Sequence, residues 1–309
     1  MKKRFFQLFI VCIGAVLIIS TLFYFLICAG LRNVKRDAEG KLNYILKDTT
    51  YYNTVFLGSS TMHVGINPIQ FDSLTGTNSF NASMDGLAIT ELNMFLPKYI
   101  AAHGAPKHLY INCDETTMGF SQKVWDFSQY YPYVNDPDMD GLLEREPKLL
   151  LGKYFPPAAV TYFGDPLKNL ALIGLFKTGK GTKYDIPMKG FVPKAQMQKK
   201  DTTLEAFFVE RDHAWQLLAE TYTLCNKNKV AVTLILMPRY YYSLSRSSVP
   251  VIDKLKSVST AFGVKVLDFT ADQRFADNNL FFDRIHLDKN GAELLTSVLA
   301  KDFKASTTQ

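Results

Sequence analysis

Two short segments that lie far apart in the sequence carry the residue types of a serine–histidine–acid catalytic set. Ser60 ends the triplet Gly-Ser-Ser at positions 58–60, directly after the apolar residues 55–57. In the second segment, Asp283 lies three residues before His286. A serine hydroxyl becomes a strong nucleophile when an imidazole takes its proton, and a carboxylate stabilises the imidazolium that forms. Ser60, His286 and Asp283 could therefore carry out acyl transfer through a covalent intermediate.

Each segment also has a purely structural interpretation. Ser59 and Ser60 could cap the helix that follows them, because serine side chains satisfy free N–H groups at a helix start. His286 could simply pack at the start of the next helix. Because both segments occur in one chain and in the order that the chemistry needs, we favour the catalytic interpretation.

The rest of the chain alternates short apolar runs with amphipathic stretches, and these elements must position the two segments. The apolar runs predict buried strands at residues 54–57, 79–81, 108–111, 230–236 and 264–267. The amphipathic stretches predict helices at residues 87–103, 204–226, 251–262 and 289–303. The alternation predicts an α/β fold with a doubly wound, parallel, five-stranded sheet. Active sites of such sheets lie at the carboxyl ends of the strands, where Ser60, Gly86 and Asn112 are all expected.

The two segments resemble the sequence blocks of the SGNH (GDSL-like) hydrolase family, and the resemblance covers residues 54–111 and 230–309. In that family the nucleophile follows a strand in a Gly-Asp-Ser or Gly-Ser-Ser turn, and an Asp-x-x-His pair lies near the C-terminus. Residues 58–60 fit the first block and residues 283–286 fit the last. The resemblance implies a flavodoxin-like fold, with Ser60 as the nucleophile and Ser59 holding the turn by local hydrogen bonds.

The two inner blocks of that family supply the donors of an oxyanion hole. Residues 81–86, Asn-Ala-Ser-Met-Asp-Gly, look like the second block and place Gly86 at its donor position. The third block, usually Gly-x-Asn-Asp, is poorly kept, because no glycine precedes Asn112 by two residues. The resemblance implies that the amides of Ser60 and Gly86, with the Asn112 side chain, form the oxyanion hole.

The N-terminal part of the chain is apolar enough to cross a membrane. Residues 5–31 are 27 residues without a charged side chain. As a helix they would extend ~40 Å at ~1.5 Å per residue, against a hydrocarbon core of ~30 Å. The basic residues at positions 2–4 favour a cytoplasmic N-terminus and an outward-facing domain. A cleaved signal peptide is the alternative, but its apolar stretch is normally only ~7 to 15 residues long.

We therefore expect four parts along the chain. Residues 1–31 would form the anchor, 32–52 a juxtamembrane linker, 53–309 the SGNH-like domain and, within it, 304–309 a flexible tail. Residues 115–201 interrupt the alternation and predict a large insertion, which could form a cap or subdomain over the active site. Its aromatic residues could offer a platform for sugar rings or could pack in the insertion's own core: Trp125, Phe127, Tyr130, Tyr131, Tyr133, Tyr154 and Phe155.

Composition and charge narrow the classes of ligand. The 309 residues are 47% hydrophobic and 21% charged, which suits a large packed core. The net charge of +6 falls to +3 without the three basic residues at positions 2–4, so nucleic-acid binding is not indicated. The histidines and cysteines lack a metal-ligand spacing, and we predict neither a metal nor a cofactor.

Three further residues each have two interpretations. Cys113 and Cys225 are expected to be buried thiols, with a disulfide between them as the alternative in an oxidising compartment. Arg239 follows the predicted strand at residues 230–236. It could reach a negatively charged group of the substrate, or it could be a solvated loop residue.

An anchored, outward-facing SGNH-like domain resembles proteins that move or remove acyl groups on bacterial cell-envelope polymers, such as those of teichoic-acid D-alanylation and alginate acetylation. We expect a single-pass membrane protein with an extracytoplasmic esterase or O-acyltransferase domain. Its substrate would be an acylated, foremost acetylated, envelope polysaccharide or sugar, and the resemblance implies a multi-spanning membrane acyltransferase as a partner. The alternatives are a catalytically silent glycan-binding or assembly component and a lipid or thioester hydrolase.

Overall fold

The computed structural model describes residues 2–34, 37–119, 124, 127–137, 139–176, 187–195, 212–240 and 248–307. Contacts divide the chain into two compact units. Unit 1 consists of Met1–Asn43 and Gln122–Tyr184, and unit 2 consists of Tyr44–Ser121 and Asp185–Gln309. The predicted catalytic segments both belong to unit 2.

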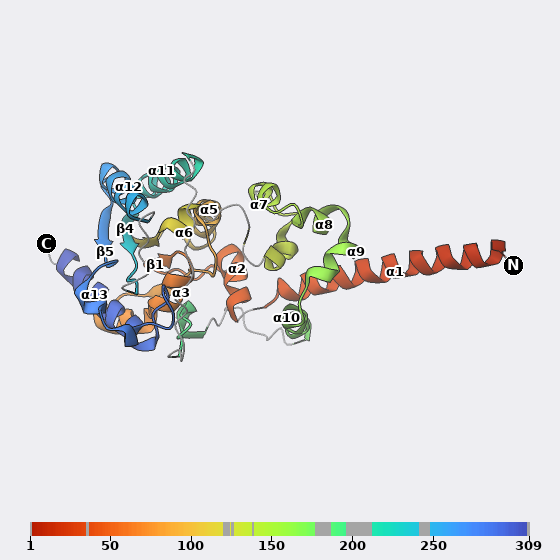
Figure 1. Cartoon of the computed structure of the whole chain (residues 1–309), viewed down its shortest axis with the longest axis horizontal. Helices are drawn as coiled ribbons and strands as arrows, with labels where there is room; N and C mark the ends of the chain where they lie inside the picture. Colours follow the sequence, from red (N-terminus) through yellow and green to blue (C-terminus); the bar gives the residue numbers. More distant parts are fainter. Residues whose placement is uncertain are drawn as a thin grey trace. The chain divides into compact units, whose positions relative to one another are not determined.

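Unit 2 is built on an all-parallel sheet of five strands in the order β2-β1-β3-β4-β5 (Figure 1). The strands are β1 (Thr54–Leu57), β2 (Ser79–Asn81), β3 (His108–Asn112), β4 (Ala231–Leu236) and β5 (Lys265–Asp268). This is the flavodoxin-like order of doubly wound sheets, so the predicted fold class is confirmed. Each strand begins and ends within one residue of its predicted bounds, because strands buried on both faces appear in the sequence as continuous apolar runs.

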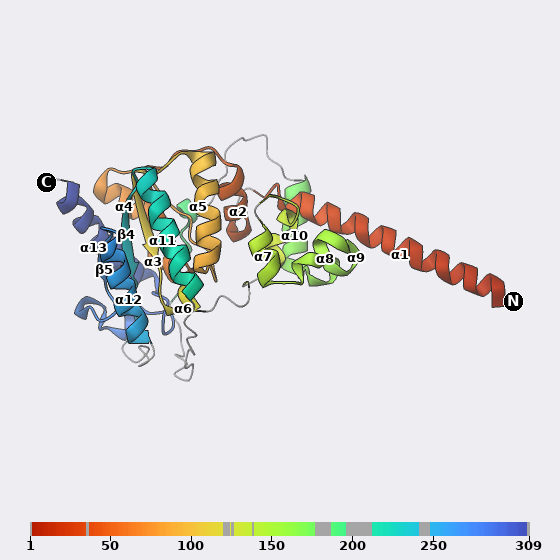
Figure 2. The same cartoon turned by 90° about the horizontal axis from the view of Figure 1, so that it is seen from above.

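Helices cover both faces of the sheet in unit 2. Its helices are α3 (Ser60–Gly65), α4 (Pro68–Thr75), α5 (Ile89–His103), α6 (Glu115–Gly119), α11 (Asp212–Lys227), α12 (Ser248–Ala261) and α13 (Lys289–Thr307). Three short 3₁₀ helices join them, namely η3 (Pro187–Gly190), η4 (Gln273–Phe275) and η5 (Asn278–Leu280). Helices α5, α11 and α12 lie on one side of the sheet and α4 and α13 on the other (Figures 1 and 2). The first eight residues of the predicted helix 204–226 lie outside the described residues.

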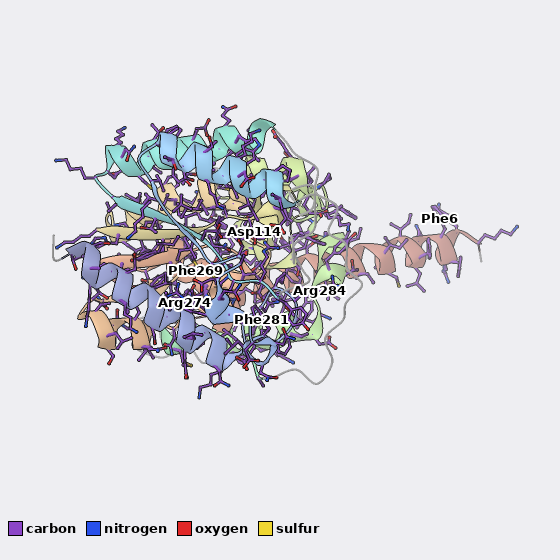
Figure 3. All side chains as sticks on the ribbon, turned by 60° about the vertical axis from the view of Figure 1, so that its left-hand side comes forward. Phe6, Asp114, Phe269, Arg274, Phe281 and Arg284 are labelled. Atoms are coloured by element: carbon purple, nitrogen blue, oxygen red, sulfur yellow. The ribbon has the colours of Figure 1, made fainter. Side chains whose placement is uncertain are left out.

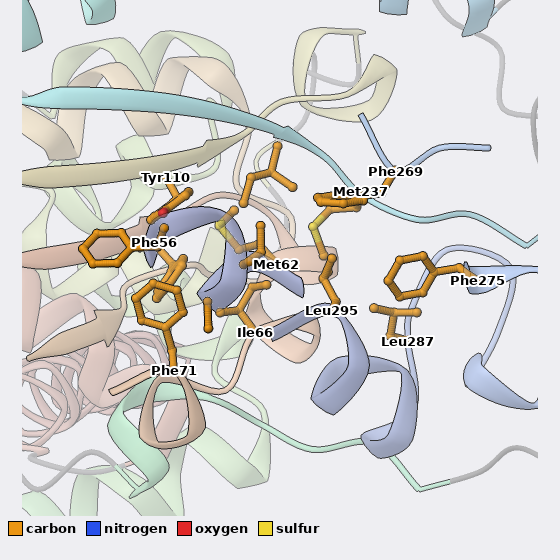
Figure 4. Close-up of a cluster of buried hydrophobic side chains, with 14 of the residues drawn as sticks. Phe56, Met62, Ile66, Phe71, Tyr110, Met237, Phe269, Phe275, Leu287 and Leu295 are labelled. Atoms are coloured by element: carbon orange, nitrogen blue, oxygen red, sulfur yellow. The ribbon is translucent and has the colours of Figure 1, made fainter. Parts of the chain in front are cut away.

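Successive side chains of β1 point to opposite faces of the sheet and so build two cores. Phe56 stacks on Tyr110 of β3 with ring centroids 5.1 Å apart and meets Phe71 of α4 edge to face at 5.2 Å (Figure 4). Val55 and Leu57 point to the other face, where they line a small apolar space with side chains of α5. This packing fixes the register of β1 and therefore the position at which its carboxyl end releases the chain.

Two stretches of the predicted domain division, the linker and the tail, contain helix in the structure. A helix, α2 (Asp37–Lys47), occupies much of the expected linker at residues 32–52, since Tyr44 packs on Phe80 with ring centroids 4.0 Å apart. The expected tail at residues 304–309 is helical as far as Thr307. Lys265 holds this last turn, because its Nζ bonds Asp302 at 2.7 Å and the Ser306 hydroxyl at 2.9 Å.

Unit 1 combines the N-terminal helix with the first part of the predicted insertion. Its elements are α1 (Lys2–Leu31), the N-terminal part of α2, η1 (Phe127–Tyr133), α7 (Asp140–Arg145), α8 (Leu149–Tyr154), α9 (Pro156–Ala159), η2 (Val160–Tyr162) and α10 (Asp165–Phe176). Helix α1 is long and apolar enough to cross a membrane, although a signal sequence would pass the same test. Most of its side chains are exposed up to Phe23, and Phe6, labelled in Figure 3, is one of them.

The last two turns of α1 are buried in unit 1. The Tyr24 hydroxyl donates to the Tyr131 carbonyl at 3.2 Å, and its ring packs against Phe163. Gly30 and Gly174 bring α1 and α10 into close contact, because a Cβ at Gly30 would lie 2.2 Å from the Ala171 carbonyl oxygen. The insertion thus uses α1 as part of its core, and its predicted role as a cap over the active site stays a prediction.

Some aromatic residues of the insertion pack in its own core, and a platform for sugar rings stays a prediction. Tyr130, Tyr131 and Tyr133 are buried and pack within unit 1. Tyr154 and Phe155 are exposed. Trp125 lies outside the described residues.

Candidate active site

Ser60 is the first residue of α3, directly after the turn that ends β1. The turn passes so close to β3 that a Cβ at Gly58 would lie 2.7 Å from the Asn112 Cβ, so only glycine fits there without a shift. Ser60 itself is half-buried. Because the first N–H groups of a helix have no partner within the helix, the Ser60 amide is available to a ligand.

His286 and Asp283 lie on a tight loop that follows η5. The loop is closed by an antiparallel bridge between Phe281 and Leu287, and both of these side chains are buried in the core that packs against α13. The Phe282 N–H donates to the His286 carbonyl at 2.9 Å. Phe281 and the neighbouring Arg284 are labelled in Figure 3. Apolar side chains at both ends of the loop therefore hold the polar residues between them in place.

The structure brings the three predicted catalytic residues into one hydrogen-bonded chain. His286 Nε2 lies 2.8 Å from Ser60 Oγ. His286 Nδ1 lies 2.7 Å from Asp283 Oδ2. These are the distances over which a proton can pass from the serine to the imidazole while the carboxylate orients the ring.

The Asp283 carboxylate is fixed by its own loop. Its Oδ1 accepts hydrogen bonds from the backbone N–H groups of Ile285 and His286, at 2.9 and 2.8 Å. Burial acts to raise the pKa of Asp283, but the His286 side chain and these two N–H groups outweigh it and hold the pKa below its usual value. Asp283 is therefore ionised at neutral pH and can stabilise a positive charge on His286.

Gly86 lies in an exposed turn after β2 that is tied to the Ser60 turn. The Met84 N–H donates to the Gly58 carbonyl at 3.1 Å, and His63 Nδ1 of α3 lies 2.8 Å from Asp85 Oδ1. Gly86 has a φ of +68°, a conformation that favours glycine. Two adjoining strands thus place the Ser60 and Gly86 turns beside each other at the carboxyl edge of the sheet.

Asn112 has partners that differ from the predicted one. Its side chain is fully buried, and Nδ2 donates to the Ile235 carbonyl at 3.2 Å. Its Oδ1 accepts from the hydroxyls of Ser59 and Thr61, at 3.1 and 2.8 Å. These contacts make Asn112 a support beneath the turn, and its role as an oxyanion donor stays a prediction. They also agree with the prediction that Ser59 holds the turn by local hydrogen bonds.

Arg239 is neither solvated nor open to a substrate in this structure. Its guanidinium binds both carboxylate oxygens of Glu115, and Nη2 lies 3.3 Å from Asp114. All three side chains are buried at the carboxyl ends of β3 and β4, with the Arg239 side chain 5% exposed. The guanidinium is thus neutralised within the protein, and both interpretations of Arg239 give way to a buried ion pair.

Sequence reasoning missed three features around the site. His63 follows Ser60 by three residues, and this helical spacing is the only local sign of its pair with Asp85. Thr61 and Glu115 contact residues that come from other strands, so no local pattern indicates their partners. All three features brace the edge of the sheet on which Ser60 stands.

The cysteines and the candidate metal ligands add no chemistry to the site. Cys113 and Cys225 are separate buried thiols, and burial raises the pKa of each. The alternative disulfide between them is not formed. Within the described ranges, no three His, Cys, Asp or Glu side chains are grouped to hold a metal ion.

No protein-family model matches the chain, and no curated protein sequence matches it. Solved structures with some similarity to it include three bacterial proteins. A protein described as lipolytic, of the G-D-S-L family, from Desulfitobacterium hafniense gives a TM-score of 0.43 at 10% identity, over 81% of this chain and 98% of that one. A protein described as an acylhydrolase from Bacteroides fragilis gives 0.43 at 11%, over 89% and 97%.

The third is a GDSL-like lipase from Bacteroides thetaiotaomicron, with a TM-score of 0.42 at 9% identity, over 87% of this chain and 100% of that one. Likenesses at this level assign neither a family nor an activity to the chain. The chemistry of the site must therefore be argued from its own geometry.

Proposed function

We propose that the chain is a membrane-anchored serine esterase or O-acyltransferase of the SGNH type. The observation that carries this proposal is the hydrogen-bonded chain from Ser60 through His286 to Asp283. It is supported by the position of all three residues at the carboxyl edge of a doubly wound sheet. A core histidine or a helix cap needs no carboxylate fixed behind it by two backbone N–H groups.

The reaction proceeds in two steps. Ser60 Oγ attacks the ester carbonyl carbon while its proton passes to His286 Nε2, and Asp283 stabilises the imidazolium. The amides of Ser60 and Gly86 donate hydrogen bonds to the oxyanion. Each bond lowers the activation free energy by roughly 3 kcal/mol. The leaving alcohol takes the proton from His286, and an acyl-serine remains. Water or a sugar hydroxyl, deprotonated by His286, then attacks the acyl group and releases an acid or a new ester.

The anchor is uncleaved in this proposal, and unit 2 lies outside the cytoplasm. The packing of α1 supports retention, because Tyr24 and the helix contact at Gly30 belong to the core of unit 1. Cleavage by a signal peptidase would remove the side chains that α1 contributes to that core. The basic residues at positions 2–4 support a cytoplasmic N-terminus.

The proposed substrates are acyl esters, foremost acetyl esters, of a cell-envelope glycan. The support is the combination of an outward-facing anchored domain with a half-buried serine that an ester on a large polymer could reach. A multi-spanning membrane acyltransferase is the proposed partner if the acyl group is transferred. With water as the only acceptor, the protein acts alone as an esterase.

A fluorophosphonate probe tests the nucleophile directly on the full chain in lipid nanodiscs. We expect labelling of the wild type, with the adduct mapped to Ser60, and loss of labelling in Ser60→Ala. Ser59→Ala is the matched control, because it removes the neighbouring hydroxyl and should keep the adduct at Ser60. An unlabelled wild type, or an adduct at Ser59, would contradict the proposed mechanism.

Substrate series then separate the candidate functions. Faster hydrolysis of short acetyl esters than of long-chain esters fits a glycan deacetylase or transferase, and the reverse order fits a lipid or thioester hydrolase. Adding an acetylated donor and an unacetylated glycan together distinguishes transfer from hydrolysis by the product formed. A chain that binds glycan but never reacts with the probe would be a silent binding component.

A further inference from the structure

Unit 1 exposes two adjacent aromatic side chains at the turn between α8 and α9. Tyr154 is 73% exposed and Phe155 is 48% exposed. Lys153 precedes them, with its Nζ 5.8 Å from the centre of the Tyr154 ring and 3.6 Å from Asp140 Oδ1. Residues 153–157 are named the aromatic turn below. Adjacent exposed rings at one turn are unusual on a surface that faces only water.

The aromatic turn is held firmly by the two helices that it joins. The Phe155 N–H donates to the Leu151 carbonyl at 2.7 Å, and the Phe155 carbonyl accepts from the Ala158 N–H at 3.1 Å. Pro156 begins α9, where its fixed φ suits the first position of a helix. The rings are therefore presented by a rigid backbone, and they do not need to be ordered when they bind.

Contacts within unit 1 fix the level of the aromatic turn along α1. Gly152, two residues before Tyr154, touches α1 so closely that a Cβ there would lie 2.5 Å from the Tyr24 hydroxyl. Tyr24 is the first buried residue of α1. In both views α8 and α9 lie on the side of unit 1 that is nearer the N-terminus of α1 (Figures 1 and 2).

The length of α1 places this level at the surface of a bilayer. The exposed part of the helix, residues 5–23, contains 19 residues. At ~1.5 Å per residue it extends ~28 Å, close to the ~30 Å of a hydrocarbon core. Tyr24 is thus where a spanning α1 leaves the lipid tails, and the aromatic turn lies at the same level.

We propose that the aromatic turn is a lipid-binding surface that rests in the headgroup region of the outer leaflet. Tyrosine is enriched at that depth because its ring is apolar and its hydroxyl is polar, and phenylalanine inserts at the boundary with the acyl chains. The Lys153 ammonium can reach lipid phosphates while its stem lies along the rings. The surface is continuous with α1 and fixes how deeply the anchor sits. This inference rests on the anchored topology of the proposed function.

Site-directed fluorescence on the full chain in nanodiscs of phosphatidylcholine and phosphatidylglycerol tests the surface. An environment-sensitive dye is attached to Tyr154→Cys in a Cys12→Ser background, where the other cysteines are buried. Phe155→Cys is a second site that leaves Tyr154 in place. Asn135→Cys is the matched control, because Asn135 is exposed in the same unit and its neighbour Asp136 pairs with Arg32, beyond the end of α1. The native Cys12, exposed on α1, reports separately on insertion of the helix.

We expect nitroxide lipids labelled near the headgroup to quench the dye at 154 and 155 and to leave the dye at 135 unquenched. Aqueous iodide should quench the dye at 135 most strongly. Nitroxides near the bilayer centre should quench the dye at Cys12. If the dye at Cys12 is quenched but the dyes at 154 and 155 behave like the dye at 135, the lipid surface is refuted while the anchor stands, and a protein would be the better occupant of the aromatic turn. If Cys12 is not quenched by any lipid, the anchored topology fails and the lipid surface fails with it.

Discussion

The two units of this chain use their side chains in opposite ways. Unit 2 buries most of the large aromatic residues that the structure describes in it, and it gathers polar groups at one edge of its sheet, where Ser60, His286 and Asp283 meet. Unit 1 exposes large apolar side chains along α1 and at Tyr154 and Phe155. The degree of burial alone therefore does not identify a functional surface. Polar groups suit a surface that faces water, and exposed apolar groups suit a surface that faces lipid.

Glycine serves close approach in both units, but with different results. In unit 2, Gly58 lets a strand-to-helix turn pass over Asn112, and this presents a hydroxyl to solvent. In unit 1, Gly30 and Gly174 let α1 and α10 touch backbone to backbone, and Gly152 leaves room for the side chains of Tyr24 and Tyr131. Small residues at helix contacts are typical of helices that pack in or beside a membrane. The close helix contact at Gly30 and Gly174 in unit 1 is of this kind.

His286→Ala tests this division of labour with the largest expected effect. Without the imidazole, Ser60 cannot lose its proton, so the fluorophosphonate labelling rate should fall ~10⁴-fold or more. The protease-resistance pattern of unit 1 should not change. His213→Ala is the matched control, because His213 is exposed on α11 and should label like the wild type. If the His286 variant were labelled at the normal rate, the proposed catalytic role of unit 2 would be wrong.

Gly30→Ala tests whether the contact between α1 and α10 holds unit 1 together. The added methyl group would lie 2.2 Å from the Ala171 carbonyl oxygen, so α1 and α10 must separate, at about 1–3 kcal/mol by the usual cost of overpacking. We expect faster proteolysis of residues 127–176 in nanodiscs and an unchanged labelling rate at Ser60.

Gly141→Ala, in α7 of the same unit, is the control for the Gly30 variant. A Cβ at Gly141 has no atom within 4 Å, so the change should be neutral or stabilise α7 by about 0.5–1 kcal/mol. Equal proteolysis of the Gly30 and Gly141 variants would show that the helix contact does not hold unit 1 together.

The sequence allowed unit 2 to be predicted far better than unit 1. Buried parallel strands appear as apolar runs, and the chemistry of a serine nucleophile requires residues that can be recognised by type and spacing. The short helices of unit 1, such as α9 with Pro156–Ala159, have no hydrophobic periodicity of their own and depend on packing against α1. A chain read from one end to the other gives no sign that residues 127–176 return to α1.

Within the site, the sequence predicted the positions of some residues without predicting the partners of their side chains. Asn112 and Arg239 both lie at the carboxyl edge, as expected. Their partners, however, come from neighbouring strands, and the identity of such a partner depends on side-chain directions that no local pattern specifies. Ser60 and His286 escaped this difficulty because their pairing is a requirement of the chemistry.

Asn112→Ala distinguishes a support from an oxyanion donor. As a support it leaves the Ser59 and Thr61 hydroxyls without their buried acceptor, so the free energy of unfolding should fall by about 1–3 kcal/mol. The labelling rate should fall with it, because the turn moves. If the Asn112 side chain also donates to the oxyanion, the rate of ester hydrolysis should fall by ~10²–10³ beyond the fall in the labelling rate. Asn279→Ala, at an exposed position in η5, should change neither quantity.

The smallest expected effect is the pH dependence that Asp283 gives to the stability of unit 2. The pKa of Asp283 is lower in the folded protein than in the unfolded chain, so its ionised form stabilises the fold. This contribution is complete above the unfolded value of about 4 and is lost as the pH falls through the folded value. The difference in unfolding temperature between the wild type and Asp283→Asn should therefore be largest near neutral pH and narrow as the pH falls below about 4.

Ser297→Ala removes a hydrogen bond from Gln70 but no titratable group, so its difference from the wild type should not vary with pH. If the Asp283 difference widened in acid, the ionised carboxylate would be destabilised by its loop, contrary to the lowered pKa.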